Sequence, residues 1–178
     1  MTPDDVIDFW FSAGEDRWFT RDAVFDGQLT VRFKDALAQA RDGEFDHWAE
    51  TPRGALALII LLDQFSRNIH RGTPLSFAAD KKALALAKEA IARGDHLQFT
   101  APQAMWFLMP LEHAEDLDAQ QRCLALFTTR GPAEMVHWAK LHLDIIARFG
   151  RFPHRNAILG RASSAEELAF LAAGGFKG

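Results

Sequence analysis

The feature that most constrains the fold is a recurring set of helix start and stop signals. Thr-Pro dipeptides stand at 2–3, 51–52 and 73–74, and Thr100-Ala-Pro is a close variant. A Thr N-cap followed by Pro in the first turn is typical of a helix start, since that proline needs no hydrogen-bond donor. The expected stops are glycines, at positions 43, 94, 131, 150 and 174. No stretch alternates with period two, so the sequence predicts an all-α fold.

Hydrophobic periodicity places the helices between these signals. We expect them over about 3–11, 21–42, 44–50, 52–66, 74–93, 101–114, 117–130, 132–149 and 164–173. The segment 55–62 is apolar on every side and should be buried all round. Pro110 should kink or end its helix, and Ser163 with Glu166 should form a capping box for the last one.

The connections between these helices are short, which favours antiparallel helix hairpins. Stacked hairpins suggest a tetratricopeptide-like α-α superhelix, although no clear sequence repeat of that class is present. The length fits a single all-helical domain over residues 1–178.

Composition excludes several classes of function. The net charge is −4, which argues against nucleic-acid binding through phosphate neutralisation. The longest apolar run, 55–62, is too short to cross a bilayer, and the acidic N-terminus does not resemble a secretory signal. The lone Cys123 suits a reducing compartment. We therefore expect a cytoplasmic protein that contacts neither nucleic acid nor membrane, and the residues identify no metal site and no particular cofactor.

A basic segment, "ARFGRFPHRN" at 147–156, is the first candidate for a site. No acidic residue occurs from 145 to 165, so the chain is an acidic body with one positive patch. The candidates are Arg148, Arg151, His154, Arg155 and Asn156. Arginines at a helix end also satisfy carbonyl groups, and Arg148 could simply pair with Asp144 four residues earlier.

A second segment, "LLDQFSRNIHRG" at 61–72, contains Asp63, Arg67, Asn68 and Arg71. Asp63 stands in the last turn of an apolar helix, where its charge opposes the helix dipole and needs a cation. Arg67, four residues on, could supply it. Such a pair could be architectural, or it could orient a guanidinium toward a ligand.

A third polar cluster, "LEHAED" at 111–116, follows Pro110. Its candidates are His113 and Glu115, beside Glu112 and Asp116. Carboxylates near a histidine can perform acid–base chemistry or bind a divalent metal, but they also occur at solvated helix ends.

Three blocks carry a resemblance to a known family. "DQFSRNIHRGTPLSFAAD" (63–80), "MPLEHAED" (109–116) and "RFGRFPHRN" (148–156), in this order, resemble the bacterial family catalogued as domain of unknown function 924. The similarity runs from "VIDFWF" to "SSAEELAFL", with Ser66 where the family usually has Pro. The resemblance implies an all-helical, tetratricopeptide-like fold and no particular activity.

The favoured hypothesis is a helical binding protein whose arginines gather around one groove. The groove would lie between the ends of 52–66 and 132–149 and the "LEHAED" segment, and would receive an anionic small molecule or peptide. The first alternative is a hydrolase or lyase with His113 or His154 as acid–base group and Asp63 or Glu115 as its carboxylate partner. The second is a protein–protein scaffold with a large exposed apolar face.

Overall fold

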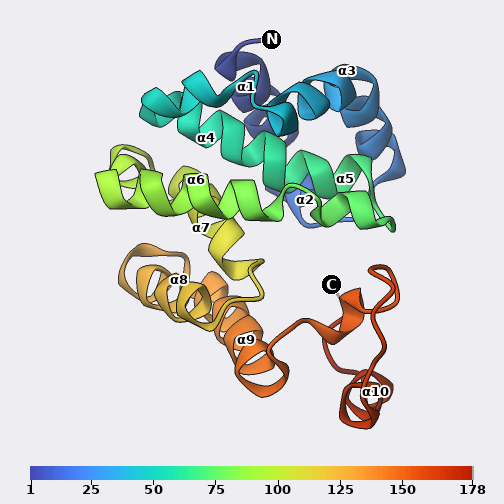
Figure 1. The fold of residues 1–178 in the computed structure, drawn as a ribbon. Helices are drawn as coiled ribbons and strands as arrows, with labels where there is room; N and C mark the ends of the chain where they lie inside the picture. Colours follow the sequence, from blue (N-terminus) through green and yellow to red (C-terminus); the bar gives the residue numbers. More distant parts are fainter. Residues whose placement is uncertain (178) are drawn as a thin grey trace.

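The computed structural model describes residues 1–177, and within them the chain forms helices joined by turns and loops (Figure 1). The α-helices are α1 (Pro3–Ala13), α2 (Glu15–Trp18), α3 (Ala23–Asp42), α4 (Pro52–Ile60), α5 (Ser66–Ile69), α6 (Asp80–Arg93), α7 (Ala101–Glu112), α8 (Leu117–Arg130), α9 (Ala133–Phe149) and α10 (Ala165–Ala172). The short 3₁₀ helices are η1 (Asp46–Glu50), η3 (Pro74–Phe77), η4 (Asp95–Gln98) and η5 (Pro153–Arg155). The segment η2 (Leu61–Phe65) is a π-helical turn. The predicted all-α class is confirmed.

Most helix starts lie where their capping residues predict. The Thr2 hydroxyl accepts from the amide of Asp5, whose carboxylate accepts in return from the Thr2 amide at 2.9 Å. The Thr51 hydroxyl accepts a hydrogen bond from the Gly54 amide at 3.1 Å. The predicted box at the last helix is wrong by one residue, because Ser164, rather than Ser163, caps Glu167.

The helical segments differ from the predicted ones at several places. The expected helix 52–66 continues to residue 69, with the π turn inside it. The expected helix 74–93 is divided into η3 and α6, and the short helices α2 and η4 were not expected. Pro110 lies within α7, which ends two residues later at Glu112.

The main core surrounds α4, which lies between α1 on one side and α6 and α7 on the other (Figure 1). Every residue from 54 to 62 is buried, which confirms the predicted all-round burial of this helix. Aromatic rings fill the space around it, with Trp10 against Trp106 and Phe33 against Phe65 at centroid distances of 5.0 and 4.7 Å. Such ring pairs add to the stabilisation from burial alone.

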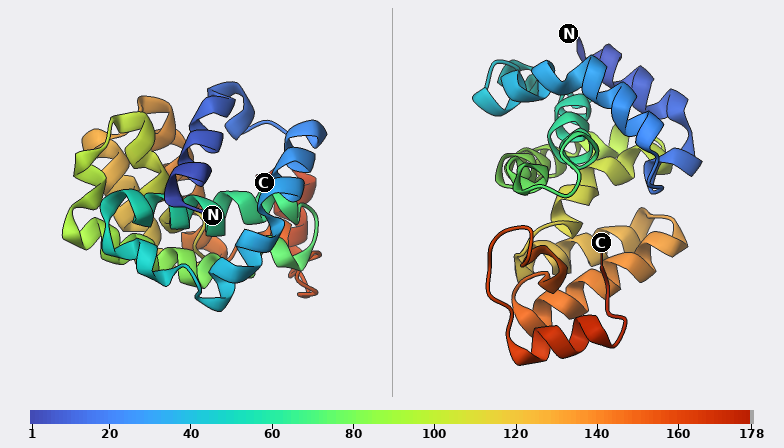
Figure 2. Two further views of the ribbon diagram at one scale, coloured as in Figure 1. Left: turned by 90° about the horizontal axis from the view of Figure 1, so that it is seen from above. Right: turned by 90° about the vertical axis from the view of Figure 1, so that its right-hand side faces the viewer.

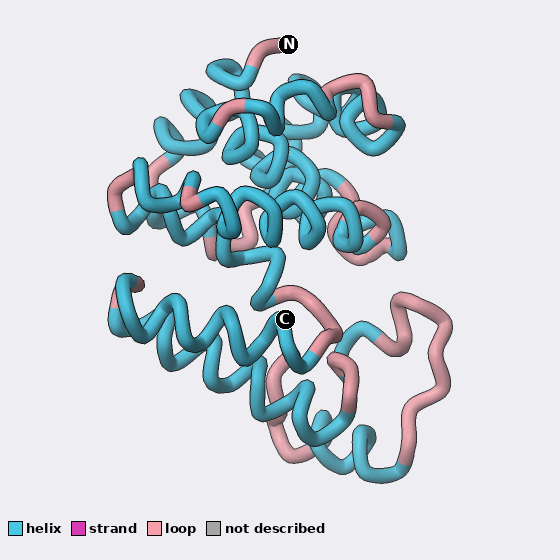
Figure 3. The backbone as a smooth tube through the Cα atoms, turned by 60° about the vertical axis from the view of Figure 1, so that its left-hand side comes forward, coloured by secondary structure: helices cyan, strands magenta, loops and turns pink. Residues whose placement is uncertain are grey.

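A smaller core holds the C-terminal part of the chain. Ile145, Ile146 and Phe152 are buried together there, with Phe149 and Phe170 packed against them. In the right-hand view of Figure 2, α8, α9 and α10 form a layer below α4 and α6, and α7 joins the two parts. Figure 3 shows the long α8 and α9 as neighbouring helices in this layer. The tetratricopeptide-like superhelix remains a prediction.

Within residues 1–177, none of the helices combines the length and the apolar character needed to cross a bilayer.

Candidate functional site

A π-helical turn places Asp63 in the interior. The turn covers Leu61–Phe65, between α4 and α5, and all of its side chains are buried. Such turns are rare and occur frequently at functional sites, because the wider turn redirects side chains from their helical positions. Asp63 is 1% exposed, so its carboxylate needs compensation within the protein.

Three side chains compensate the Asp63 carboxylate. The His113 Nδ1 atom lies 2.8 and 3.0 Å from its two oxygens, and the Arg67 guanidinium lies 3.1 Å away. The Gln64 amide also donates to Oδ2. Burial alone would raise the pKa of Asp63, but Arg67 and His113 outweigh it and hold this pKa at about 2. Asp63 is therefore ionised at neutral pH.

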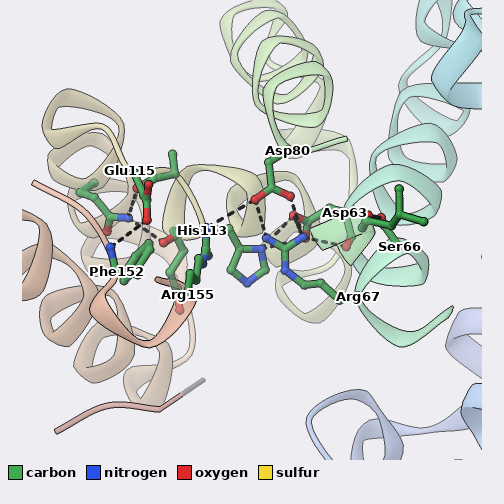
Figure 4. Close-up of polar contacts among 12 residues, drawn as sticks. Asp63, Ser66, Arg67, Asp80, His113, Glu115, Phe152 and Arg155 are labelled. Atoms are coloured by element: carbon green, nitrogen blue, oxygen red, sulfur yellow. Dashed lines mark hydrogen bonds and ion pairs between the residues drawn. The ribbon is translucent and has the colours of Figure 1, made fainter. Parts of the chain in front are cut away.

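Asp80, at the start of α6, is shared by two arginines. Arg67 donates to both of its oxygens at 3.0 and 3.1 Å, and also to the Asp63 carbonyl at 2.9 Å. Arg155 reaches Asp80 through one contact of 3.5 Å. The cluster of Asp63, Arg67, Asp80, His113 and Arg155 is called the Asp63 cluster below (Figure 4).

Arg155 is the least satisfied member of the Asp63 cluster. It is 6% exposed, and its guanidinium lies 4.8 Å from the centroid of the Phe77 ring and 4.5 Å from that of the Phe152 ring. Its Nε atom has no hydrogen-bond partner within residues 1–177, and the contact to Asp80 is at the long limit for a hydrogen bond. Burial and the charge of Arg67 lower the pKa of Arg155 to about 10. The group stays protonated, but its charge is poorly compensated.

His113 is oriented by Asp63. An ionised carboxylate only accepts hydrogen bonds, so Nδ1 carries the proton and Nε2 is an acceptor. Burial and the charge of Arg67 lower the pKa of His113, which keeps the ring neutral at pH 7. In Figure 4 the ring lies between Arg67 and Arg155, and within residues 1–177 no hydrogen bond reaches Nε2. This arrangement suits a proton acceptor.

Glu112 and His142 form a neutral pair beside the cluster. Burial and the Asp63 charge raise the pKa of Glu112 to about 8, and burial lowers the pKa of His142 to about 4. Their 3.3 Å contact is therefore not an ion pair at pH 7. His142 donates to the Trp138 carbonyl at 2.8 Å instead. Glu112 is a buried carboxylic acid whose Oε2 atom has no partner in the described chain.

Other candidates belong to a network that holds the C-terminal segment. Glu115 accepts from the Phe152 amide at 2.8 Å and from Arg161 at 2.6 and 2.9 Å. Arg161 also donates to Asn156, which donates to Ser163 at 3.0 Å. These contacts lower the pKa of Glu115 against the effect of its burial. Glu115 and Asn156 are thus occupied by internal partners.

Arg148 and Arg151 are paired with α10. Arg151 donates to both oxygens of Glu167 at 2.7 and 2.8 Å. Helical spacing offered Asp144 as a partner for Arg148. In the structure Arg148 pairs with Glu166 instead, at 2.8 Å. The reason is that α10 returns across the end of α9, so a carboxylate from another helix reaches the guanidinium. Together with the Glu115 contacts, these pairs are called the C-terminal network below.

Asn68 and Arg71 contact α3 and not the Asp63 cluster. Arg71 donates to both oxygens of Asp26 at 2.7 and 3.0 Å, and Asn68 donates to the same carboxylate at 2.9 Å. The two residues fix the end of α5 to α3. His154 is close to Arg155, and burial followed by that charge lowers its pKa to about 4.

The structure thus brings together four of the candidate residues, namely Asp63, Arg67, His113 and Arg155. Arg148, Arg151, Glu115 and Asn156 belong to the C-terminal network. Asn68 and Arg71 pair with Asp26, and His154 lies near Arg155. Sequence reasoning missed Asp80, although an acid at the start of a helix shortly after unmatched arginines is a usable signal. Within residues 1–177 there is no group of three or more His, Cys, Asp or Glu side chains placed to hold a metal ion.

These features define an all-helical protein with a charged cluster inside it. The chain belongs to the family described as bacterial protein of unknown function (DUF924), whose model matches residues 6–175. It is also similar to a solved structure, the protein of unknown function ATU0120 from Agrobacterium tumefaciens. The two are 44% identical with a TM-score of 0.92, over 96% of this chain and 97% of that one. No curated protein matches the chain. The resemblance given above is confirmed.

Proposed function

We propose that the protein binds a small anionic molecule at the Asp63 cluster. The observation that carries the proposal is Arg155, a buried guanidinium with an unpartnered Nε and one long contact to a carboxylate that Arg67 already occupies. A buried cation with unused donors is costly, and an anionic oxygen would compensate it. The depressed pKa of Arg155 reflects the same deficit.

The neighbouring His113 narrows the class of ligand. Its Nε2 accepts a hydrogen bond at neutral pH, so a ligand that touches both groups needs an anionic oxygen and also a proton donor. A small hydroxycarboxylate has both. The guanidinium of Arg155 also packs against the rings of Phe77 and Phe152, and a carboxylate would bind at its planar N–H edge.

Calorimetric titration with malate, and separately with inorganic phosphate, tests this proposal. We expect malate to bind the wild type and to lose about tenfold or more in affinity in Arg155→Met, because a charge-assisted hydrogen bond disappears while the packing between the two rings is kept. Arg148→Met is the matched control, since that arginine is exposed and paired with Glu166. Equal loss in both variants, or no binding of either anion, contradicts the proposal.

Single substitutions are preferable to a double change at Arg151 and Arg155. Arg151 holds Glu167 through two hydrogen bonds, so its removal would loosen α10 and confuse stability with binding. Arg155 can be changed without disturbing that contact.

A second candidate is an enzyme that acts on an anionic substrate, favoured by the 2.8 Å contact between Asp63 and His113 Nδ1. A carboxylate that fixes the tautomer of a neutral histidine is the usual arrangement of a general base. In a hydrolase or lyase, His113 Nε2 would take the proton and Arg155 would stabilise the negative charge.

An activity screen on anionic esters and hydroxycarboxylates, with and without divalent metal ions, separates binding from catalysis. Turnover that His113→Gln abolishes while malate still binds would support the enzyme. Turnover that survives in His113→Gln would exclude the histidine as base.

A further inference from the structure

A hollow lies away from the Asp63 cluster, between η4, the first half of α7 and the end of α8. Its volume is about 410 Å³, within the usual range for small-molecule sites. The walls are apolar and include Phe99, Met105, Leu108, Leu126 and Phe127. No member of the Asp63 cluster lines it, so it is a separate site.

The rim of this pocket is positively charged. Arg130 lines it, and Arg122 is near enough to act on the same histidine, His96. Within residues 1–177 no carboxylate pairs with either arginine at ion-pair distance. Asp95, the acid whose charge acts on His96, already accepts two hydrogen bonds from Arg93 at 2.6 and 3.1 Å.

His96 adds a second sign of an unfilled position. Its side chain lines the pocket, and its Nδ1 atom is buried without a hydrogen-bond partner in the described chain. Burial and the charges of Arg130 and Arg122 lower the pKa of His96, so the ring is neutral at pH 7 and can donate from one nitrogen. A buried polar atom without a partner is uncommon and calls for a ligand or an ordered water.

We propose that this pocket binds a free carboxylate with a medium-length hydrocarbon chain. The chain lies against the apolar wall of α7 and α8, and the carboxylate lies at the rim with Arg130 and His96. The proposal combines an apolar cavity with unpaired cations at one end, the charge pattern that complements an amphiphilic anion. It is independent of the function proposed for the Asp63 cluster.

Titration of the whole protein with decanoate below its micellar concentration tests the inference. We expect saturable binding of one decanoate, with a shift of the Met105 methyl resonance. Decanol, which keeps the chain and lacks the charge, should bind about tenfold more weakly, as for the loss of one charge-assisted contact. Ala104→Phe, which fills the cavity, should abolish binding of both compounds.

Two variants distinguish the effect of the charge of Arg130 from nonspecific electrostatic attraction of decanoate to the protein surface. Arg130→Gln should weaken decanoate about tenfold and leave decanol unchanged, whereas Arg21→Gln, at an exposed position outside the pocket, should alter neither. Absence of saturable binding, or equal affinity for decanoate and decanol, overturns the proposal. Tighter binding of N-acetyl-alanyl-leucine than of decanoate also overturns it, since the occupant would then be a peptide C-terminus.

Discussion

Inside the protein, Arg67 and Arg155 share the carboxylate of Asp80, whereas at the C-terminal end Arg151 pairs with Glu167, a carboxylate to which no other arginine of the described chain donates. All of these residues are arginines, but their positive charges are compensated to different degrees. Because the carboxylate is shared, the Nε donor of Arg155 has no partner in the described part of the chain, whereas each arginine of the C-terminal network has a carboxylate partner.

This difference separates the arginine proposed to bind a ligand from two arginines with a structural role, all within one short segment. Arg148, Arg151 and Arg155 stand within eight positions of one another, yet only Arg155 turns toward the interior. The αL conformation of Gly150, with φ of 68°, ends α9 and sends the chain around this corner. The number of arginines in a segment is therefore a poor guide to a ligand site. A buried donor without a hydrogen-bond partner is a better one.

The largest effect is expected from Asp63→Asn. This change leaves the largely buried Arg67 with Asp80, which Arg155 also contacts, as its remaining carboxylate, and it removes the carboxylate that orients His113. Removal of one partner from a buried charged group costs about 3–5 kcal/mol of unfolding free energy. Because the pKa of Asp63 is lowered to about 2, its contribution is present above pH 4 and is lost as the pH falls toward 2. Urea unfolding at neutral and acidic pH measures both effects.

Glu166→Gln in the C-terminal network is the control for that measurement, since it removes an exposed carboxylate. We expect a change within about 0.5 kcal/mol. An equal loss for Asp63→Asn and Glu166→Gln would mean that the interior charges are no more important than those at the surface.

A smaller effect, of opposite sign, is expected from Glu112→Gln. The pKa of Glu112 rises from 4.5 to about 8 on folding, so the folded state binds this proton more tightly and loses stability as the pH rises through that interval. Glutamine keeps the shape and has no proton to lose. We expect the variant to gain on the order of 2 kcal/mol over wild type at pH 8 and little at pH 4. Thermal unfolding of both proteins across this pH range measures the difference in stability. A gain that does not depend on pH would contradict the raised pKa of Glu112.

The smallest effect is local and concerns Arg151→Gln. We expect global stability to change little and the amides of α10 to exchange about tenfold faster, because a terminal helix opens independently of the core. Hydrogen exchange read by NMR measures this. Arg148→Gln, whose ion pair is exposed, should leave the exchange unchanged, and identical behaviour of the two variants would show that Glu167 does not hold the helix.

The sequence specified the helices better than it specified the contacts between them. Thr2, Thr51 and Thr100 cap helices where they were expected to, because capping depends on a few neighbouring residues. The π turn around Asp63 has no comparable local signal. It follows from packing against other helices, which a single sequence does not reveal.

The same limit applies to the site. The pair Asp63–Arg67 follows from helical spacing, and the structure contains it. The contacts from Asp63 to His113 and from Arg155 to Asp80 join residues 50 and 75 positions apart, so only the tertiary fold could supply them. Arg151 and Arg155 were both candidates because they stand in the basic segment 147–156. The partner of Arg151, Glu167, belongs to the later helix α10, so the sequence alone did not reveal this pair.

The most direct test of the central claim is ¹⁵N NMR of the arginine Nε–H groups during titration with malate. The Arg155 resonance, assigned by its absence in Arg155→Met, should shift with saturation, because its Nε has no hydrogen-bond partner among residues 1–177. The resonances of Arg148 and Arg151 should stay in place, since each already donates to a carboxylate. An unmoved Arg155 resonance, or equal shifts for all three, would contradict the account.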